Sequence, residues 1–171
     1  MKVAVIGSGG REHSICESLK LSNKLNKIYC IPGNAGTSKI ANNIEIEIND
    51  FEKIKEFILE NKIDITIIGP EKPLVDGIVD YLEKYGIKVF GPNRIASQLE
   101  GSKIFTKKLC EKYNIPTAKS GIFNDIESAR KFLKNYNFPI VVKADGLAAG
   151  KGVFICENEN QYLSAVEEIF K

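Results

Sequence analysis

The sequence predicts an α/β fold, in which a doubly wound parallel sheet is followed by the first part of an α+β domain. Short apolar runs in the first part of the chain end in glycine-containing loops and alternate with helical patterns, which is typical of parallel strands buried on both faces. Right-handed crossovers between such strands favour a doubly wound sheet. Beyond residue 101 the order of elements changes. We therefore expect two domains, residues 1–101 and residues 102–171.

The expected strands of the first domain are KVAVIG, KIYCI, IDITIIG and IKVFG, at residues 2–7, 27–31, 63–69 and 87–91. Apolar residues at helical spacing predict a helix over residues 51–60, with Asp50 as its N-cap. A second helix is expected over residues 74–85, with Gly86 as a left-handed C-terminal cap. The alternating segment NIEIEI, residues 43–48, predicts a half-exposed or edge strand.

The second domain is expected to contain helix 102–114, strand 117–123, helix 125–136, strands 139–145 and 153–156, and a last helix that begins at Asn158. Asn158 with Gln161 resembles a capping box. About 70 residues in this order, with two strands joined by a glycine-rich hairpin, look like the beginning of a domain rather than a whole one.

The composition, 43% hydrophobic and 27% charged, is that of a globular protein. No apolar run approaches the ~18 residues of a membrane span, so we expect a cytoplasmic protein. A net charge of +2 without a dense basic patch argues against nucleic acid as a partner. The four cysteines form no C-x-x-C pair, and we interpret them as reduced, buried thiols rather than metal ligands.

GSGGREH, residues 7–13, follows the first expected strand and opens a helix, as a dinucleotide-binding loop does. Its third glycine position holds Glu12, and no ribose-binding acid follows the second strand, which argues against NAD. Backbone N–H groups at the helix start still attract an anion by roughly 0.3–1 kcal/mol, and Arg11 adds a charged fork. The alternative is a tight turn that only needs glycine. We interpret His13 as a packed or capping residue rather than a catalytic base.

Two further loops follow expected strands and hold candidate substrate groups. PGNAGT, residues 32–37, is rich in small hydrogen-bonding residues, and GPEKP, residues 69–73, holds Glu71 between two prolines. A rigid carboxylate suits sugar hydroxyls or an amine, although either loop could be a surface turn. Because ligands of doubly wound sheets bind beyond the C-terminal ends of the strands, we expect one crevice to collect all three loops.

VVKADGLAAGKGV, residues 141–153, looks like a phosphate loop but does not match the Walker sequence. Only three residues separate its first two glycines, and Lys151 is followed by glycine rather than Ser or Thr. The segment joins two strands, so we expect a flap that closes over a phosphate. If Val142 faces one side of its strand, Lys143 faces the other, and an inward lysine needs an anionic partner such as phosphate.

The whole chain resembles the phosphoribosylamine–glycine ligase family, also called glycinamide ribonucleotide synthetases, of the ATP-grasp superfamily. The motifs that carry the resemblance are VIGSGGREH, PGNAGT, GPEKPLVDG, FGPN, QLEGSK and VVKADGLAAGKGV, in this order. Small departures occur at Ser14 and Ile31. The resemblance implies a pre-ATP-grasp N-terminal domain that binds a substrate, followed by the incomplete start of an ATP-grasp domain.

The resemblance implies ATP-dependent ligation of glycine to 5-phosphoribosylamine through glycyl phosphate, giving glycinamide ribonucleotide, ADP and phosphate in de novo purine biosynthesis. It implies a phosphoribosylamine site that contains Gly9, Gly10, Arg11, Glu12, Asn34, Ala35, Gly36, Thr37 and Glu71. It implies contacts with ATP from Lys103, Lys143, Gly146, Ala149, Gly150, Lys151 and Gly152. The ligands of Mg²⁺ or Mn²⁺ are expected in the remainder of the ATP-grasp domain, beyond residue 171, so we expect the isolated chain to be inactive.

Three other functions stay open from the sequence. The chain could be a non-catalytic module that holds a sugar phosphate, or an NAD-linked oxidoreductase, which Glu12 disfavours. Within the superfamily, a carboxylase or another purine-pathway ligase is the third alternative, against which PGNAGT together with GPEKPLVDG argues. Separate titrations with ribose 5-phosphate and ATP would distinguish a ligase from a simple sugar-phosphate module.

Overall fold

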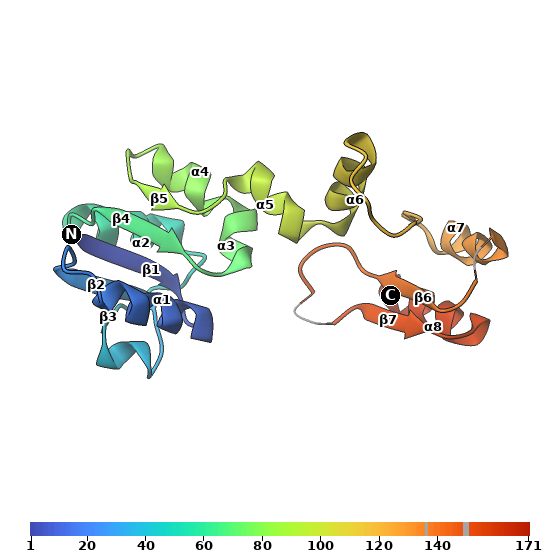
Figure 1. Ribbon diagram of the computed structural model, residues 1–171, viewed down its shortest axis with the longest axis horizontal. Coiled ribbons are helices and arrows are strands. Elements are labelled where there is room, and N and C mark those ends of the chain that lie inside the picture. Colours follow the sequence, from blue (N-terminus) through green and yellow to red (C-terminus); the bar gives the residue numbers. More distant parts are fainter. Residues whose placement is uncertain (136, 149–150) are drawn as a thin grey trace. The chain divides into compact units, whose positions relative to one another are not determined.

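The computed structural model describes residues 1–135, 137–148 and 151–171, which form two compact units, residues 1–98 and residues 99–171 (Figure 1). The predicted α/β class is confirmed, because the first unit contains a five-stranded parallel sheet. The domain boundary that we expect at residue 101 stays a prediction. None of the described helices is long and apolar enough to cross a membrane.

The parallel sheet of the first unit has the strand order β3-β2-β1-β4-β5. Its strands are β1 (Lys2–Gly7), β2 (Lys27–Pro32), β3 (Asn42–Asn43), β4 (Ile65–Ile68) and β5 (Val89–Phe90). The central β1 pairs with β2 on one side and β4 on the other, so that Val5 lies opposite Cys30 and Ile67. The chain extends the sheet outward from β1 in both directions, which makes the β1/β4 boundary the topological switch point.

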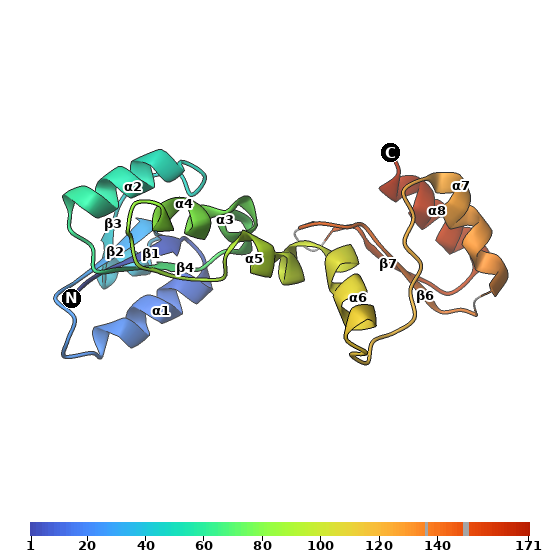
Figure 2. The same ribbon diagram turned by 90° about the horizontal axis from the view of Figure 1, so that it is seen from above.

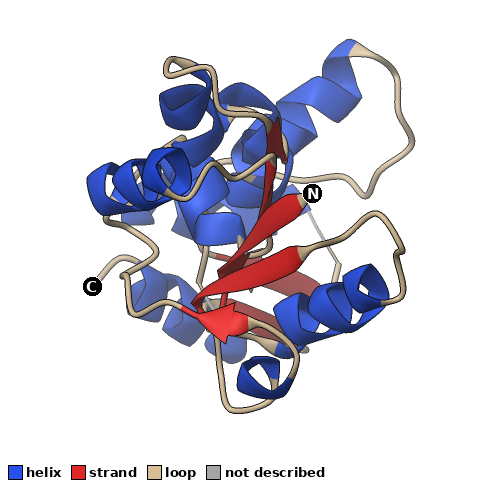
Figure 3. Cartoon of the chain, turned by 90° about the vertical axis from the view of Figure 1, so that its left-hand side faces the viewer, coloured by secondary structure: helices blue, strands red, loops and turns tan. Residues whose placement is uncertain are grey.

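Helices cover both faces of this sheet, as expected for a doubly wound fold (Figures 2 and 3). On one face lies α1 (Gly10–Lys20), whose Cys16 packs in a buried cluster with Val3, Val5, Ile28 and Cys30. On the other face lie α2 (Phe51–Glu60) and the pair α3 (Glu71–Asp76) and α4 (Ile78–Glu83). Their apolar residues join a second buried cluster, which includes Ile54, Ile58, Ile78 and Leu82.

Two local predictions for the first unit need correction, and one helix was missed. The expected helix over residues 74–85 is broken at Gly77, whose φ of 97° is left-handed. Of the expected strand 43–48, only Asn43 lies in a strand, the two-residue edge strand β3. Ile44 N still donates to Cys30 O of β2 at 2.9 Å, and Ile44, Ile46 and Ile48 pack against the core. The helix α5 (Arg94–Gly101) was not predicted. By contrast, α2 and its Asp50 cap are confirmed, since the Asp50 side chain accepts a hydrogen bond from Lys53 N.

The second unit contains an antiparallel pair, β6 (Ile140–Lys143) and β7 (Val153–Cys156), and several helices. These are α6 (Lys103–Lys112), α7 (Ile126–Lys131), the 3-10 turn η2 (Phe132–Asn135) and α8 (Glu159–Ile169). A core of Ala129, Cys156, Tyr162, Ala165 and Val166 joins β7, α7 and α8. The Tyr162 hydroxyl donates to Ala129 O at 2.7 Å, which ties α8 to α7.

Two predictions for the second unit also differ from the structure. Residues 117–123 form no strand. This exposed segment is instead bound by Lys107, whose Nζ donates to Thr117 Oγ1 at 2.8 Å and to Ala118 O at 2.5 Å. Only half of the expected capping box forms at α8. Asn158 Oδ1 accepts from Gln161 N, but the Gln161 side chain accepts from Glu157 N.

The break at Gly77 gives a stability prediction. We expect Gly77→Ala to lower the free energy of unfolding by about 1–2 kcal/mol, because an L-residue is strained at this φ. The added methyl group would also lie 3.3 Å from Arg94 Cδ. Urea denaturation of the chain, followed by circular dichroism, measures the change. Gly10→Ala is the matched control, because its methyl group would meet no atom within 4 Å. Equal stability of the two variants would contradict the prediction.

Candidate functional site

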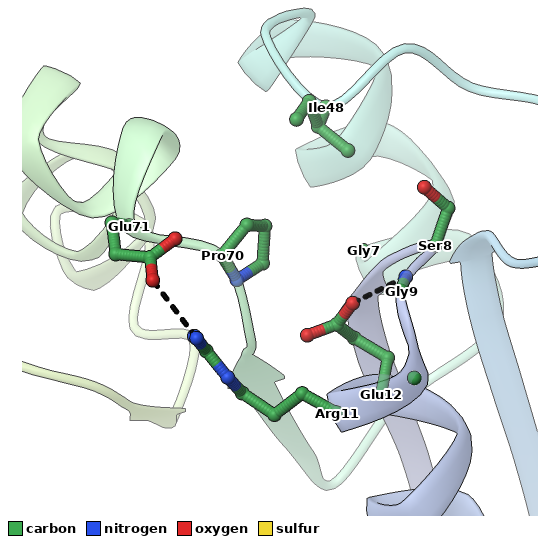
Figure 4. Close-up of a pocket in the computed structure, with 9 residues that line it drawn as sticks. Gly7, Ser8, Gly9, Arg11, Glu12, Ile48, Pro70 and Glu71 are labelled. Atoms are coloured by element: carbon green, nitrogen blue, oxygen red, sulfur yellow. Dashed lines mark hydrogen bonds and ion pairs between the residues drawn. The ribbon is translucent and has the colours of Figure 1, made fainter. Parts of the chain in front are cut away.

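A cavity of about 360 Å³ lies at the C-terminal ends of β1 and β4, at the topological switch point of the sheet. Figure 4 shows how its walls come from the loop after β1, the start of α1, and the loop before α3. The lining residues are Gly7, Ser8, Gly9, Gly10, Arg11, Glu12, Ile48, Pro70 and Glu71. The structure thus brings together two of the three predicted loops, and adds Ile48, which the sequence did not indicate.

Glu12 is only 4% exposed and lies at the centre of this wall. Its Oε2 accepts a hydrogen bond from Gly9 N at 2.6 Å, so the carboxylate folds back onto the N-terminus of its own helix. The same carboxylate packs so closely on Gly69 that a Cβ atom there would lie 2.1 Å from Glu12 Oε1. A dinucleotide-binding loop leaves this space open for a pyrophosphate. In this chain the Glu12 carboxylate fills it.

Arg11 and Glu71 face one another across the mouth of the cavity (Figure 4). Arg11 Nη2 donates to Glu71 Oε1 at 2.8 Å, and Arg11 Nη1 donates to Gly69 O at 2.5 Å. Both side chains are about half exposed, 57% and 42% respectively. The hydrogen bond from Arg11, helped by the backbone N–H of Glu71, holds the pKa of the Glu71 carboxyl below its ordinary value of 4.5. The pair places a carboxylate and a guanidinium at the cavity mouth.

The PGNAGT loop supports the cavity from behind and does not line it. Asn34 Nδ2 donates to Ser8 O at 2.8 Å, while Asn34 Oδ1 accepts from the N–H groups of Gly36 and Thr37. The Thr37 side chain is fully buried at the start of the 3-10 turn η1 (Thr37–Lys39), and its Oγ1 donates to Asn43 Oδ1 at 2.8 Å. Ala35 is exposed. Contact of these four residues with a substrate stays a prediction.

His13 lies against the same loop. A Cβ atom on Gly36 would lie 2.7 Å from His13 Cε1, so the imidazole ring occupies the space beside this glycine. His13 Nε2 also lies 3.8 Å from Glu17 Oε1, one turn further along α1. The His13 side chain thus contacts the loop while 39% of it stays exposed.

In the second unit, the two candidate phosphate-binding lysines have different surroundings. Lys103, the first residue of α6, donates from Nζ to Gly146 O at 2.9 Å, so it contacts the glycine-rich loop directly. Val142 packs against the core, and Lys143 points to the opposite face of β6. That face is solvent-exposed: Val141 beside it is 49% exposed and Ile155 on β7 is 71% exposed. The predicted alternation is present, and Lys143 lies on the exposed face of β6 rather than inward.

The glycine-rich loop between β6 and β7 is closed at its base, where Ala144 N donates to Gly152 O at 2.8 Å. Gly146 and Gly152 have left-handed φ values of 89° and 73°. Lys151 N donates to Ala148 O at 2.8 Å. The predicted contacts of Ala149 and Gly150 fall outside the described residues.

Sequence reasoning missed Asp145 in this loop. Its Oδ1 accepts from Ile104 N at 3.2 Å, and both of its carboxylate oxygens accept from the Ser102 hydroxyl. Asp145 thereby binds the first turn of α6. An Asp after a strand is common in loops. What distinguishes Asp145 is its contact with Ile104 and Ser102, 41 and 43 residues earlier, and sequence spacing does not reveal such partners.

Comparison with known proteins gives a consistent result for both units. The family model described as phosphoribosylglycinamide synthetase, N domain, matches residues 1–100, and the one described as phosphoribosylglycinamide synthetase, ATP-grasp (A) domain, matches residues 101–171. A phosphoribosylamine–glycine ligase of Caldanaerobacter subterraneus subsp. tengcongensis is 55% identical over 91% of this chain and 37% of the relative. Another, from Clostridium acetobutylicum, is 45% identical over 100% of this chain and 42% of the relative.

Among solved structures, the crystal structure of phosphoribosylamine–glycine ligase from Thermotoga maritima is similar, with a TM-score of 0.76 and 32% sequence identity. The match covers 96% of this chain and 38% of that one. The chain therefore spans about two fifths of the length of the relatives that it matches.

The Arg11–Glu71 pair predicts how the Glu71 carboxyl titrates. In Arg11→Ala we expect the pKa of Glu71 to rise towards its ordinary value of 4.5, because the lowering hydrogen bond is lost. The stability that the pair contributes is present above pH 4.5 and is lost as the pH falls through the lower, folded-state pKa. An NMR titration of the Glu71 carboxyl carbon measures the shift. Lys72→Ala is the control, since Lys72 pairs with Asp76 and its loss should leave Glu71 unchanged. An unchanged Glu71 pKa in Arg11→Ala would contradict the assignment.

Proposed function

The chain belongs to the phosphoribosylglycinamide synthetase family, and we propose that it supplies the first part of a ligase that joins glycine to 5-phosphoribosylamine. In this reaction the γ-phosphoryl group of ATP passes to the glycine carboxylate and ADP leaves. The amine nitrogen of phosphoribosylamine then attacks the acyl carbon of glycyl phosphate and displaces phosphate, which gives glycinamide ribonucleotide. The cavity at the switch point of the first sheet is the observation that carries the proposal.

The chemistry of that cavity suits a ribose that carries an amine. Two carboxylates, Glu12 and Glu71, border it and are acceptors for hydroxyl or amine hydrogens, while Arg11 supplies one cationic fork. Because Glu12 occupies the α1 N-terminus, a phosphate placed there would meet a like charge. We therefore place the ribose hydroxyls and the amine of phosphoribosylamine near the carboxylates, and the phosphate away from the start of α1.

The nucleotide belongs to the second unit in this proposal. Lys103 and Lys143 would contact ATP phosphates, and the backbone of the loop over residues 146–152 would approach them. At an effective dielectric constant near 20, a lysine about 4 Å from a phosphate charge contributes roughly 4 kcal/mol before desolvation, enough to matter in phosphoryl transfer. Lys103 is already at the loop, whereas Lys143 presents its ammonium group on an open sheet face.

The metal ion of the reaction is not assigned to the described residues. Among the described residues, no three His, Cys, Asp or Glu side chains gather so as to hold a metal ion, so no step of the reaction is assigned to Mg²⁺ or Mn²⁺ through them. We place the metal ligands in the portion of the ligase that the relatives have and this match does not cover. It follows that the 171 residues by themselves should turn over no glycine. The cytoplasmic location expected from the sequence stays a prediction.

A pair of substitutions in a full-length ligase that carries these residues tests both assignments. We expect Glu71→Gln to raise KM for phosphoribosylamine by about tenfold, as for loss of a hydrogen bond to a charged group, and to leave KM for ATP and glycine unchanged. Lys143→Ala should lower the rate of glycine-dependent ADP formation without changing KM for phosphoribosylamine. Lys119→Ala, at an exposed position of the same unit, is the control for Lys143.

The opposite pattern of effects, or unchanged kinetics in both variants, would show that these residues have been assigned to the wrong substrates. The 171-residue chain, assayed under the same conditions, is the negative control, and glycine-dependent turnover by it would contradict the inactivity proposed for it.

A further inference from the structure

Asp145 connects two segments of the second unit that are far apart in the sequence. It follows Lys143 by two residues at the end of β6, and its carboxylate reaches the first turn of α6. There Oδ1 accepts from Ile104 N at 3.2 Å and Oδ2 accepts from Ser102 Oγ at 3.0 Å. Ser102 itself caps α6, because its hydroxyl accepts from Phe105 N. The carboxylate therefore shares the exposed donors of the helix start with the N-cap residue.

A side chain of α6 also donates a hydrogen bond to the loop that contains Asp145. Lys103 lies between the two residues that donate to Asp145, and its Nζ donates to Gly146 O at 2.9 Å. Gly146 adopts a left-handed φ of 89°, which turns the chain immediately after Asp145. Four hydrogen bonds thus join residues 102–104 to residues 145–146. Removing the carboxylate would release three of them and leave Lys103 with a single backbone acceptor.

The electrostatics of Asp145 agree with this arrangement. Partial burial raises the pKa of its carboxyl, but the Ile104 N–H, the Ser102 hydroxyl and the N–H groups of Gly146 and Lys103 together outweigh it and leave the pKa below the ordinary value. The carboxylate is thus charged at neutral pH, where its bonds to the α6 start are strongest.

We propose that Asp145 is a positioning residue for nucleotide binding, which holds the Lys103 ammonium group at the start of the glycine-rich loop and keeps it in a set relation to Lys143 on β6. The inference rests on the proposed function, in which both lysines contact ATP phosphates. Asp145 acts through Lys103 and touches no substrate. Its carboxylate orients a cation that, on a free α6 terminus, would sample many side-chain rotamers.

A purely structural role would be a helix cap, and the same unit holds a matched example of one. Asp125 caps α7, where its Oδ1 accepts from Ser128 N at 2.8 Å and its Oδ2 accepts from Ser128 Oγ at 2.6 Å. The pKa of Asp125 is also below its ordinary value, with the Ser128 side chain as the main cause. Asp125 therefore resembles Asp145 in residue type and in donors, but α7 carries neither candidate lysine. Comparing substitutions of Asp145 and Asp125 therefore distinguishes the effect of losing a helix cap from the effect of losing the position of Lys103.

The experiment uses Asp145→Ala, Asp145→Asn and Asp125→Ala in a full-length ligase that carries these residues. We expect Asp145→Ala to raise both KM and Kd for ATP by about tenfold, with KM for phosphoribosylamine unchanged. Asp145→Asn should recover part of the loss, because its side-chain oxygen still accepts from Ile104 N. Asp125→Ala should lower the melting temperature while leaving both ATP constants as in the unsubstituted enzyme.

Two results would overturn the proposal: equal effects of Asp145→Ala and Asp125→Ala on ATP, or no change in the Kd for ATP in Asp145→Ala. Titration of ATP alone by calorimetry makes the outcome independent of turnover. If the unsubstituted enzyme binds ATP but forms no ADP with glycine and phosphoribosylamine, the proposed function fails and the positioning role is still decided by Kd. An unsubstituted enzyme that does not bind ATP would contradict both.

Discussion

The site of the first unit depends on one buried carboxylate, that of Glu12. A carboxylate that is 4% exposed costs free energy unless hydrogen bonds compensate, and here the compensation comes from Gly9 N and the N-terminus of α1. Its close packing requires glycine at two neighbouring positions. A Cβ atom on Gly7 would lie 2.6 Å from the Glu12 side chain, and one on Gly69 would lie 2.1 Å from it. One side chain thus fixes the loop after β1 against the loop after β4.

The remaining contacts of the cavity follow from this arrangement. Once Gly69 is held against Glu12, its carbonyl oxygen accepts from Arg11, and the same guanidinium reaches Glu71 at the start of α3. Asn34 then joins the loop after β2 to Ser8. Because the Glu12 carboxylate already accepts from Gly9 N at the start of α1, the chain keeps the sheet and the glycine-rich turn of a dinucleotide-binding fold but adds a carboxylate of its own to that turn. This difference is the basis for placing a polyhydroxyl amine, rather than a dinucleotide, in the cavity.

The strands β1 and β2 could be predicted almost to the residue, because continuous apolar runs are required of strands buried on both faces. Apolar spacing could not reveal the break at Gly77. The apolar residues before and after it recur at the spacing of one continuous helix, although the structure has two helices there, α3 and α4. Residues 117–123 have the composition of a strand but are bound by Lys107 instead of a neighbouring strand. Glu12 and Glu71 could be selected from their loops, whereas Ile48 and Asp145 depend on contacts between distant segments, which no local pattern encodes.

The most direct test of this account is an NMR titration of the ¹⁵N-labelled chain with ribose 5-phosphate. We expect the amide signals of Gly9, Gly10, Glu12 and Glu71 to shift and saturate, and Glu12→Gln to weaken the affinity by about tenfold. Glu17→Gln is the matched control, because Glu17 is an exposed acid of the same helix, with 56% of its side chain accessible. Shifts confined to residues 99–171, or equal affinity in Glu12→Gln and the unsubstituted chain, would contradict the assignment of this cavity to the sugar phosphate.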